Sequence, residues 1–204
     1  MSIIIQDRDV ARKFLQQRRE SGHDRWDEVW DGVYNLMPNP NVEHQSIATR
    51  FTMPLGPVVM WPELGRVFQG VNVSDQSEDW TRNYRCPDVA VYLTENPASL
   101  RGAYMQGGPD FAVEIISPDD RTREKFAFYH RVGVREFLLI DRDPWSLELY
   151  QRDDAAWKLV GTSKPEQPDS LKSAVLPLAF CLEPGEPRPK IVVTHSDGLQ
   201  EWLV

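Results

Sequence analysis

The amino-acid sequence predicts an α/β (α+β) fold in which one mixed β-sheet is flanked by helices. Apolar runs of strand length alternate with segments whose apolar residues recur at helical spacing. Their order along the chain is helix, hairpin, helix, several strands, helix and strands. The chain has 204 residues, which suits one compact domain, and its 41% hydrophobic content with seven Trp suffices for a core.

The N-terminal part of the chain is predicted to form a helix, a β-hairpin and a second helix. Residues 7–20 carry apolar side chains four apart, with acids leading and bases trailing, as in a surface helix. Asp31-Gly32 lies between β-prone residues, which is a strong signal for a two-residue hairpin turn. Asn39 or Asn41 can then cap the start of the second helix.

The chain from there to about residue 163 is predicted to form the sheet and one further helix. Helical spacing over 119–134 predicts a helix that Gly133 can end, and turn-forming residues over 94–109 predict a long loop. The expected strands are 65–73, 86–93, 111–117 and 136–141, followed by a β-meander over 146–153 and 157–162.

Residues 1–163 are therefore expected to form a single domain. Residues 164–204 are rich in Pro and show no regular pattern. We expect them to be an irregular C-terminal extension that packs on the domain or trails from it. No internal repeat or low-complexity tract is present.

The amino-acid composition argues against several classes of protein. The net charge of −8 argues against a broad basic face that coats DNA, although it is compatible with a small local basic groove. Two cysteines, Cys86 and Cys181, are too few for a disulfide framework, and no Cys-x-x-Cys pair exists. We see no signal peptide and no run approaching the ~20 apolar residues of a membrane span. We expect a cytoplasmic protein that has no membrane partner.

Two of the expected strands carry an acid inside an apolar run. Asp88 stands in CPDVAVY and Glu114 in FAVEIIS, and each shares its strand face with a small alanine that leaves room beside the carboxylate. If these strands are sheet neighbours, roughly 4.8 Å apart, both acids can reach one ion. Magnesium prefers oxygen ligands and commonly uses one or two carboxylates. We therefore predict that Asp88 and Glu114 bind Mg²⁺ (or Mn²⁺).

Lys125 is the third candidate for this site. It falls in the first turns of the expected helix after Glu114, and helical side chains lean toward the N-terminus, so it should point back toward that acid. A lysine there can orient a water or neutralise charge at phosphorus. Asp110 competes as a ligand because it also follows a proline, but it lies roughly 13 Å from Glu114 along one strand and cannot share its ion.

The segments around these residues resemble a known family. PDVAVY…FAVEIISPDDRTREKFAFYHRVGVREFLLID resembles the Uma-two family, a bacterial domain of unknown function within the PD-(D/E)XK nuclease superfamily, and WDGVYNLMPNPNVEHQSIA is similar to its upstream block. The resemblance runs from about residue 25 to 152, the expected core, with the motifs in the family's order. It implies a restriction endonuclease-like core, Asp88 and Glu114 as metal ligands, and often Mg²⁺-dependent phosphodiester hydrolysis.

The chain departs from the superfamily pattern in one place. The motif has Glu-x-Lys on the strand, whereas Ile116 stands two positions after Glu114. The resemblance implies that the lysine has moved to the following helix, where Lys125 matches. It also implies a further acid ligand on a helix, for which Glu43 is the candidate. His44, beside it, could contact substrate or stabilise the fold.

Two functions are open at this point. The first is a metal-dependent nuclease acting on nucleic acid, with DNA ahead of RNA, in which Arg121 and Arg123 face phosphate rather than only solvent. A homodimer is compatible with it, since many nucleases of this type cut as pairs. The alternative is a non-catalytic binding or assembly module on a nuclease-like fold, favoured by the missing strand lysine and the acidic net charge. Under this alternative, Glu114 and Lys125 form a buried ion pair.

Overall fold

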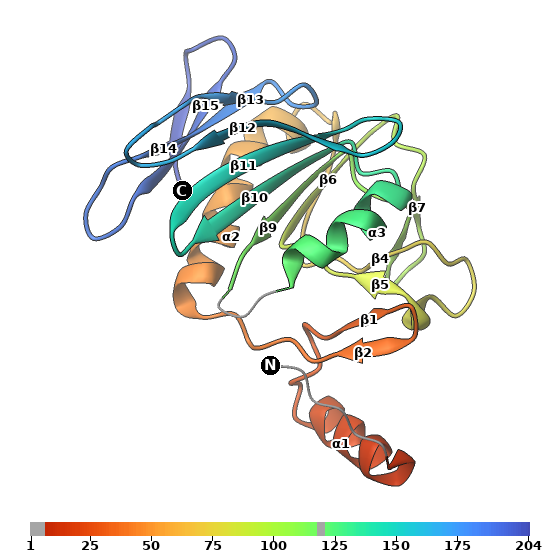
Figure 1. Cartoon of the computed structure of the whole chain (residues 1–204). Helices are drawn as coiled ribbons and strands as arrows, with labels where there is room; N and C mark the ends of the chain where they lie inside the picture. The colour runs from red at the N-terminus through yellow and green to blue at the C-terminus, as the bar shows by residue number, and fades with distance from the viewer. Residues whose placement is uncertain (1–6, 118–120) are drawn as a thin grey trace.

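A mixed six-stranded sheet forms the centre of the computed structural model, which describes residues 7–117 and 121–204 (Figure 1). Strands β9 and β10 are parallel, and every other neighbouring pair in this sheet is antiparallel. The expected α+β class and the β-meander are confirmed. The strand order is β12 (Trp157–Ser163), β11 (Trp145–Arg152), β10 (Glu136–Arg142), β9 (Phe111–Ile115), β6 (Val89–Leu93) and β3 (Gly65–Gln69).

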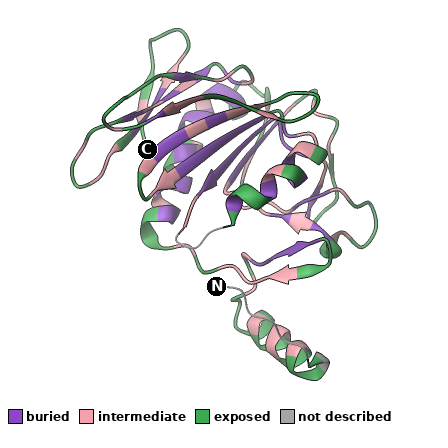
Figure 2. Ribbon diagram, viewed as in Figure 1, coloured by how far each residue is buried: buried purple, intermediate pink, exposed green. Residues whose placement is uncertain are grey.

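Helices cover both faces of this sheet. Side chains alternate along β9, so Phe111, Val113 and Ile115 face one side, where they share a buried cluster with α2 (Val42–Leu55). Ala112 faces the other side and belongs to the buried cluster of α3 (Phe126–Arg131). The strands between the two helices are buried along most of their length (Figure 2). Glu114 therefore lies on the α3 side of the sheet, in a strand that is buried along its whole length.

A second sheet of short strands lies beside α3, and its first two strands are the expected hairpin. The turn residues Asp31 and Gly32 have φ of +48° and +84°, the left-handed conformation that a two-residue hairpin turn requires. The sheet order is β2 (Val33–Asn35), β1 (Glu28–Trp30), β5 (Tyr84–Arg85), β4 (Val73–Ser74), β8 (Met105–Gln106) and β7 (Ser99–Leu100).

One expected strand ends earlier than predicted, and one expected loop contains two short strands of the second sheet. The predicted strand 65–73 is wrong beyond Gln69, because Gly70 takes a φ of +68° and turns the chain toward β4 in the second sheet. The loop expected over 94–109 contains β7 and β8. Each correction has its own physical reason. A left-handed glycine ends the predicted strand, and short strand pairings order the predicted loop. Neither feature is visible in hydrophobic periodicity.

Each of the two N-terminal α-helices begins directly after a residue whose side chain caps it. Asp7 caps α1 (Arg8–Glu20) by accepting from two backbone N–H groups, and Asn41 rather than Asn39 caps α2. A short π-turn (Gly56–Met60) follows α2, and a 3₁₀ turn (Trp80–Arg82) precedes β5. Helix α1 projects away from the body in Figure 1. None of the helices within residues 7–117 and 121–204 is long and apolar enough to cross a membrane.

The helix expected over 119–134 is shorter than predicted. Asp119 lies outside the described residues; a 3₁₀ turn covers Thr122–Lys125, and α3 follows over Phe126–Arg131. Gly133, with a φ of +88°, lies just past its end as expected. Lys125 is consequently the last residue of the 3₁₀ turn rather than a residue of the α-helix.

The prediction that 164–204 is irregular is wrong. This segment forms an antiparallel sheet in the order β13 (Leu171–Lys172), β14 (Leu178–Glu183), β15 (Lys190–His195) and β16 (Glu201–Leu203). Phe180 stacks on Phe51 of α2 and on Phe111 of β9, with ring centroids 5.6 and 5.5 Å apart. The proline residues mark the connections, while the apolar strand residues complete the buried cluster around α2.

Candidate active site

Glu114 lies on β9, and Asp88 lies directly before the neighbouring strand β6, one residue short of the predicted strand position. Antiparallel pairing of β6 with β9 places Val89 beside Val113, so the next positions of the register are Asp88 and Glu114. The Asp88 carboxylate reaches across this pair, because its Oδ2 accepts a hydrogen bond of 2.7 Å from the backbone N–H of Ile115. The expectation that the two acid-bearing strands are neighbours is confirmed.

The carboxyl group of Glu114 is buried and surrounded by hydrogen-bond donors. Its side chain is 4% exposed, and Nζ of Lys125 lies 3.0 and 3.1 Å from its two oxygens. The hydroxyl of Tyr129, from α3, donates to Oε1 at 2.5 Å. Lys125 therefore points back to Glu114 as the sequence predicts. Tyr129 also joins this cluster, whereas from the sequence it would be assigned to the core alone.

Glu28 is a member of the site that the sequence analysis missed. This residue of β1 has a side chain 1% exposed, and its Oε1 lies 2.9 Å from Nζ of Lys125. The indole N–H of Trp30 donates to Oε2 at 2.6 Å, and the backbone N–H of Cys86 donates to Oε1 at 2.8 Å. The available signal was an acid next to apolar residues in a predicted strand, the same signal that identified Glu114. Its partner lies too far along the sequence for local reasoning to find.

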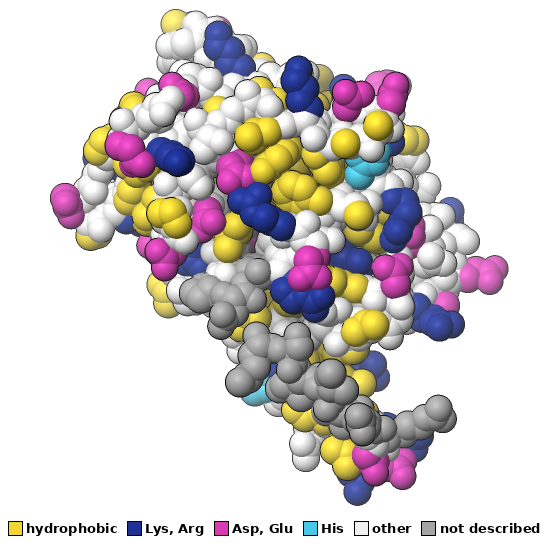
Figure 3. Space-filling view, viewed as in Figure 1, with side chains coloured by type: hydrophobic (Ala, Val, Ile, Leu, Met, Phe, Trp, Pro, Cys, Tyr) yellow, Lys and Arg dark blue, Asp and Glu magenta, His cyan; other side chains and the backbone are white. Residues whose placement is uncertain are grey.

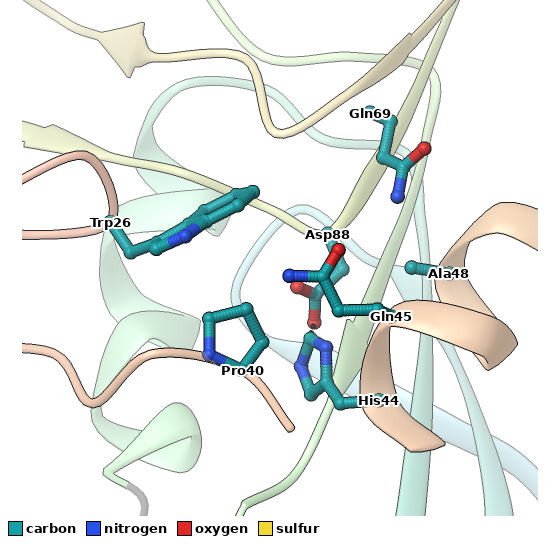
Figure 4. Close-up of a pocket in the computed structure, with 7 residues that line it drawn as sticks. All are labelled: Trp26, Pro40, His44, Gln45, Ala48, Gln69 and Asp88. Carbon is teal, nitrogen blue, oxygen red and sulfur yellow. Dashed lines mark ion pairs between the residues drawn. The ribbon is translucent and has the colours of Figure 1, made fainter. Parts of the chain in front are cut away.

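His44 lies beside Asp88 and faces a hollow on the surface. Its Nε2 is 3.3 Å from Oδ2 of Asp88, and both side chains are nearly covered, at 10% and 14% exposure. Figure 4 shows His44 and Gln45, from α2, on one side of the hollow and the rings of Trp26 and Pro40 on the other. Asp88 is the acid of this cluster that reaches solvent through this hollow.

Glu43 does not join the two strand acids. Its carboxylate pairs with Arg142 at 3.0 Å and lies 4.0 Å from Nε of Arg188. Glu43 and His44 are consecutive residues of α2, so their side chains point in different directions, and His44 is the one that meets Asp88. The side chain of α2 that contacts Asp88 is therefore the imidazole of His44 and not the carboxylate of Glu43.

The two arginines expected to face phosphate are paired with acids of this chain. Arg121 pairs with Glu124 and lies over the Trp30 ring at 4.7 Å. Arg123 pairs with Glu148 at 2.8 Å. Asp110, the competing ligand, is a structural residue: it accepts from the backbone N–H of Leu93 and pairs with Arg135.

Comparison with known proteins identifies the family. A sequence model of the Uma2 family, described as "Putative restriction endonuclease", matches residues 12–184. The chain belongs to the Uma2 family. A search of the curated proteins found no match.

A solved structure has the same fold as this Uma2 chain. It is the crystal structure of a putative nuclease of DUF820 from Anabaena variabilis ATCC 29413, with a TM-score of 0.55 and 20% sequence identity. The match covers 73% of this chain and 83% of that chain. The likeness shows that the two chains share a fold.

The donor set of the Uma2 site has the chemistry of a site for a hard divalent cation. Glu28 and Glu114 contact one lysine and Asp88 lies near Glu114, so negative charge exceeds positive charge in a covered space, and a divalent ion would offset the excess. Within residues 7–117 and 121–204 no group of three or more His, Cys, Asp or Glu side chains is spaced to hold a metal.

The burial of Glu114 makes the stability of this Uma2 chain depend on pH. Burial, together with the nearby charges of Asp88 and Glu28, raises the pKa of Glu114 to about 8, although Lys125 and Tyr129 oppose the shift. Between pH 4.5, the ordinary pKa, and about 8 the folded chain keeps a proton that the unfolded chain releases. The free energy of unfolding should therefore fall as pH rises through this range.

Thermal unfolding in EDTA at a series of pH values checks this expectation. The melting temperature of Glu114→Gln should fall less steeply between pH 5 and 8 than that of the wild type, because the neutral amide carries no titrating proton. Parallel curves for the two proteins would show that Glu114 is ionised throughout and would contradict the assignment.

Proposed function

We propose that this protein is a Mg²⁺-dependent nuclease that hydrolyses phosphodiester bonds of nucleic acid, with Mn²⁺ as an alternative ion. The observation that carries the proposal is the cross-strand pair of Asp88 and Glu114 at one end of two central strands, where Asp88 lines a surface hollow. The family description as restriction endonucleases supports nucleic acid, and DNA ahead of RNA, as the substrate. We propose a homodimer on the same resemblance.

Each residue of the site has a role in this proposal. Asp88 and Glu114 hold the ion through carboxylate oxygens. A bound Mg²⁺ would supply Lewis-acid polarisation of a phosphodiester oxygen and activation of water. Lys125 neutralises the negative charge that develops at phosphorus, the role usually given to the strand lysine that Ile116 replaces.

Glu28 acts as the positioning residue for Lys125. Its carboxylate is fixed by the Trp30 indole and the Cys86 amide, and it contacts the lysine ammonium directly. When the Glu114 carboxylate turns to an ion, Lys125 keeps a charged partner and stays at the site.

A cleavage assay with matched aspartate variants tests the proposal. Wild-type protein should cut labelled single-stranded or duplex DNA or RNA in Mg²⁺ and not in EDTA, and Asp88→Asn should reduce the rate by at least about 100-fold, as expected for loss of a ligand. Asp110→Asn is the control, since Asp110 also follows a proline but pairs with Arg135. Equal cutting by Asp88→Asn and Asp110→Asn, or cutting in EDTA, would contradict the proposal.

A non-catalytic binding or assembly module on this fold is the second candidate. One observation favours it: Lys125 already bridges Glu114 and Glu28 at hydrogen-bond distance, so the buried charges are partly satisfied without an ion. This candidate requires no metal affinity at the site. A wild-type protein that binds no divalent ion and cuts none of these substrates would establish it over the nuclease.

A further inference from the structure

Three arginines gather around one carboxylate near the start of α2. The Glu43 carboxylate accepts a hydrogen bond of 3.0 Å from Arg142 and lies 4.0 Å from Nε of Arg188. Arg50 follows Glu43 by two helical turns on the same face of α2, and its charge acts on Arg188. Among the described residues, Glu43 is the acid that pairs with Arg142 and Arg188, and Arg50 pairs with none. Three guanidinium groups thus share one carboxylate, which leaves positive charge in excess.

Two of these guanidinium groups are largely covered, which makes the excess charge favour an anion. The side chains of Arg142 and Arg188 are 8% and 23% exposed. Burial lowers the pKa of Arg188, the Glu43 carboxylate opposes this shift, and the positive charge of Arg50 adds to it. The Glu43 carboxylate itself is 42% exposed, so its place between the two guanidinium groups is open to solvent. An anion from solution can therefore reach the position that Glu43 occupies.

This arginine cluster borders the proposed ion site. Glu43 directly precedes His44, whose imidazole contacts Asp88. On the other side, Nε of Arg142 donates to a backbone carbonyl two positions after Glu114. The start of α2 and the turn between β10 and β11 lie at the same end of the central sheet (Figure 1). The cluster and the ion site are thus joined by neighbouring residues of two elements.

We propose that Arg50, Arg142 and Arg188 bind a backbone phosphate of the substrate strand, next to the phosphate that is cut. The Glu43 carboxylate occupies this place when no nucleic acid is bound. The inference rests on the proposed function and adds a phosphate subsite to it. Arginine suits both partners, because its planar guanidinium forms the same paired hydrogen bonds with carboxylate and phosphate. Displacing Glu43 costs little, since a half-exposed ion pair adds little to stability.

A local site of this kind fits the charge of the whole chain. The net charge is −8, and acidic and basic side chains are interspersed on the face in Figure 3. Arg121 and Arg123, the arginines that the sequence suggests for phosphate contact, are each paired with an acid of their own. Affinity for nucleic acid comes largely from basic groups at phosphates. A cluster in which arginines outnumber acids is therefore where this chain can supply such affinity.

Equilibrium binding at several salt concentrations tests this inference. The probe is a fluorescein-labelled oligonucleotide, made as DNA and as RNA, each single-stranded or annealed to its complement. Full-length protein is titrated into it with Ca²⁺ in place of Mg²⁺, and anisotropy is followed. Arg188→Gln should weaken binding about tenfold, because one charge-assisted contact is lost. It should also lower the slope of log affinity against log salt concentration by about 0.7 for a single strand and about 0.9 for duplex DNA.

Glu43→Gln should have the opposite effect. It should strengthen binding about two- to fivefold, because no carboxylate then competes with phosphate for the guanidinium groups. If the ion pairs of Glu43 were only structural, its replacement would leave binding unchanged or weaken it. Arg50→Gln should weaken binding as Arg188→Gln does, and it changes an exposed side chain at little risk to folding.

Arg66→Gln is the matched control for the arginine variants. Arg66 is exposed on β3 and pairs in register with Tyr92, at the end of the strand away from Asp88. Its replacement removes the same charge from the chain and should leave binding as in the wild type. Circular dichroism checks that each variant is folded. If Arg188→Gln does not fold, Arg50→Gln and Glu43→Gln decide the matter.

The outcomes separate this inference from the proposed function. Wild-type affinity in the folded arginine variants Arg50→Gln and Arg188→Gln overturns the phosphate subsite and leaves the nuclease proposal standing. Binding by Glu43→Gln that is no tighter than that of the wild type, or an equal loss in Arg66→Gln, does the same. Binding of none of the oligonucleotide forms by the wild type overturns both proposals.

Discussion

Replacing Lys125 with methionine should lower the free energy of unfolding by about 3–5 kcal/mol in the absence of metal. The lysine side chain is 4% exposed and lies within 3.0 Å of both Glu28 and Glu114. Removing it leaves the buried Glu28 carboxylate without a cation, next to a Glu114 carboxyl whose pKa is raised to about 8. Urea or guanidinium unfolding at pH 7, compared with the wild type in EDTA, measures the loss.

Two further variants make this result specific. Lys158→Met changes an exposed lysine on β12 and should shift stability by no more than about 0.5 kcal/mol. The double variant Lys125→Met with Glu114→Gln should be about as unstable as Lys125→Met alone, because the buried carboxylate left without a cation is that of Glu28. A Lys125→Met protein as stable as the wild type would mean that the ion pairs around Lys125 contribute nothing to folding.

Replacing Glu114 with glutamine should lower the affinity for Mn²⁺ by on the order of 100-fold or more while the protein stays folded. Changes to groups that only orient metal ligands already weaken binding by about 10–100-fold, so loss of a ligand carboxylate should weaken it at least as much. The amide can still accept from Tyr129, and Lys125 keeps Glu28, so the buried groups remain satisfied. Binding is measured by calorimetric titration and folding by circular dichroism.

Glu43→Gln is the matched control for this variant. The resemblance implies Glu43 as a further ligand, whereas the structure pairs it with Arg142. Its replacement should leave Mn²⁺ affinity unchanged. If Glu43→Gln loses binding and Glu114→Gln retains it, the ion lies at the helix α2 side and the site has been assigned to the wrong acid.

The strand acids could be found from sequence because their signal is local. An acid inside an apolar run is costly to bury, so Asp88 and Glu114 stood out, and Lys125 followed from the direction of helical side chains. Glu28 has the same local signal but its meaning depends on Lys125, 97 positions further along the chain (125 − 28). Such a contact is set by how the second sheet packs against α3, which no local pattern encodes.

The fold was predictable where periodicity is strong and was missed where short strands dominate. The central strands are long enough to show alternation or a continuous apolar run. The C-terminal sheet is hard to predict because Pro residues lie between its strands, and a Pro-rich segment indicates irregular chain as readily as strand ends. In the structure Leu178, Phe180 and Leu182 alternate along β14 and form its buried face.

The central claim is that Glu114, a buried carboxyl with a raised pKa, is a ligand of a divalent ion. Calorimetric titration of the wild type with Mn²⁺ at pH 7, in two buffers of different ionisation enthalpy, tests it most directly because it counts protons released on binding. Since the pKa of Glu114 is about 8, binding should release about one proton per ion, and a folded Glu114→Gln should release none. Binding without proton release, or equal release by Glu114→Gln, would contradict the claim.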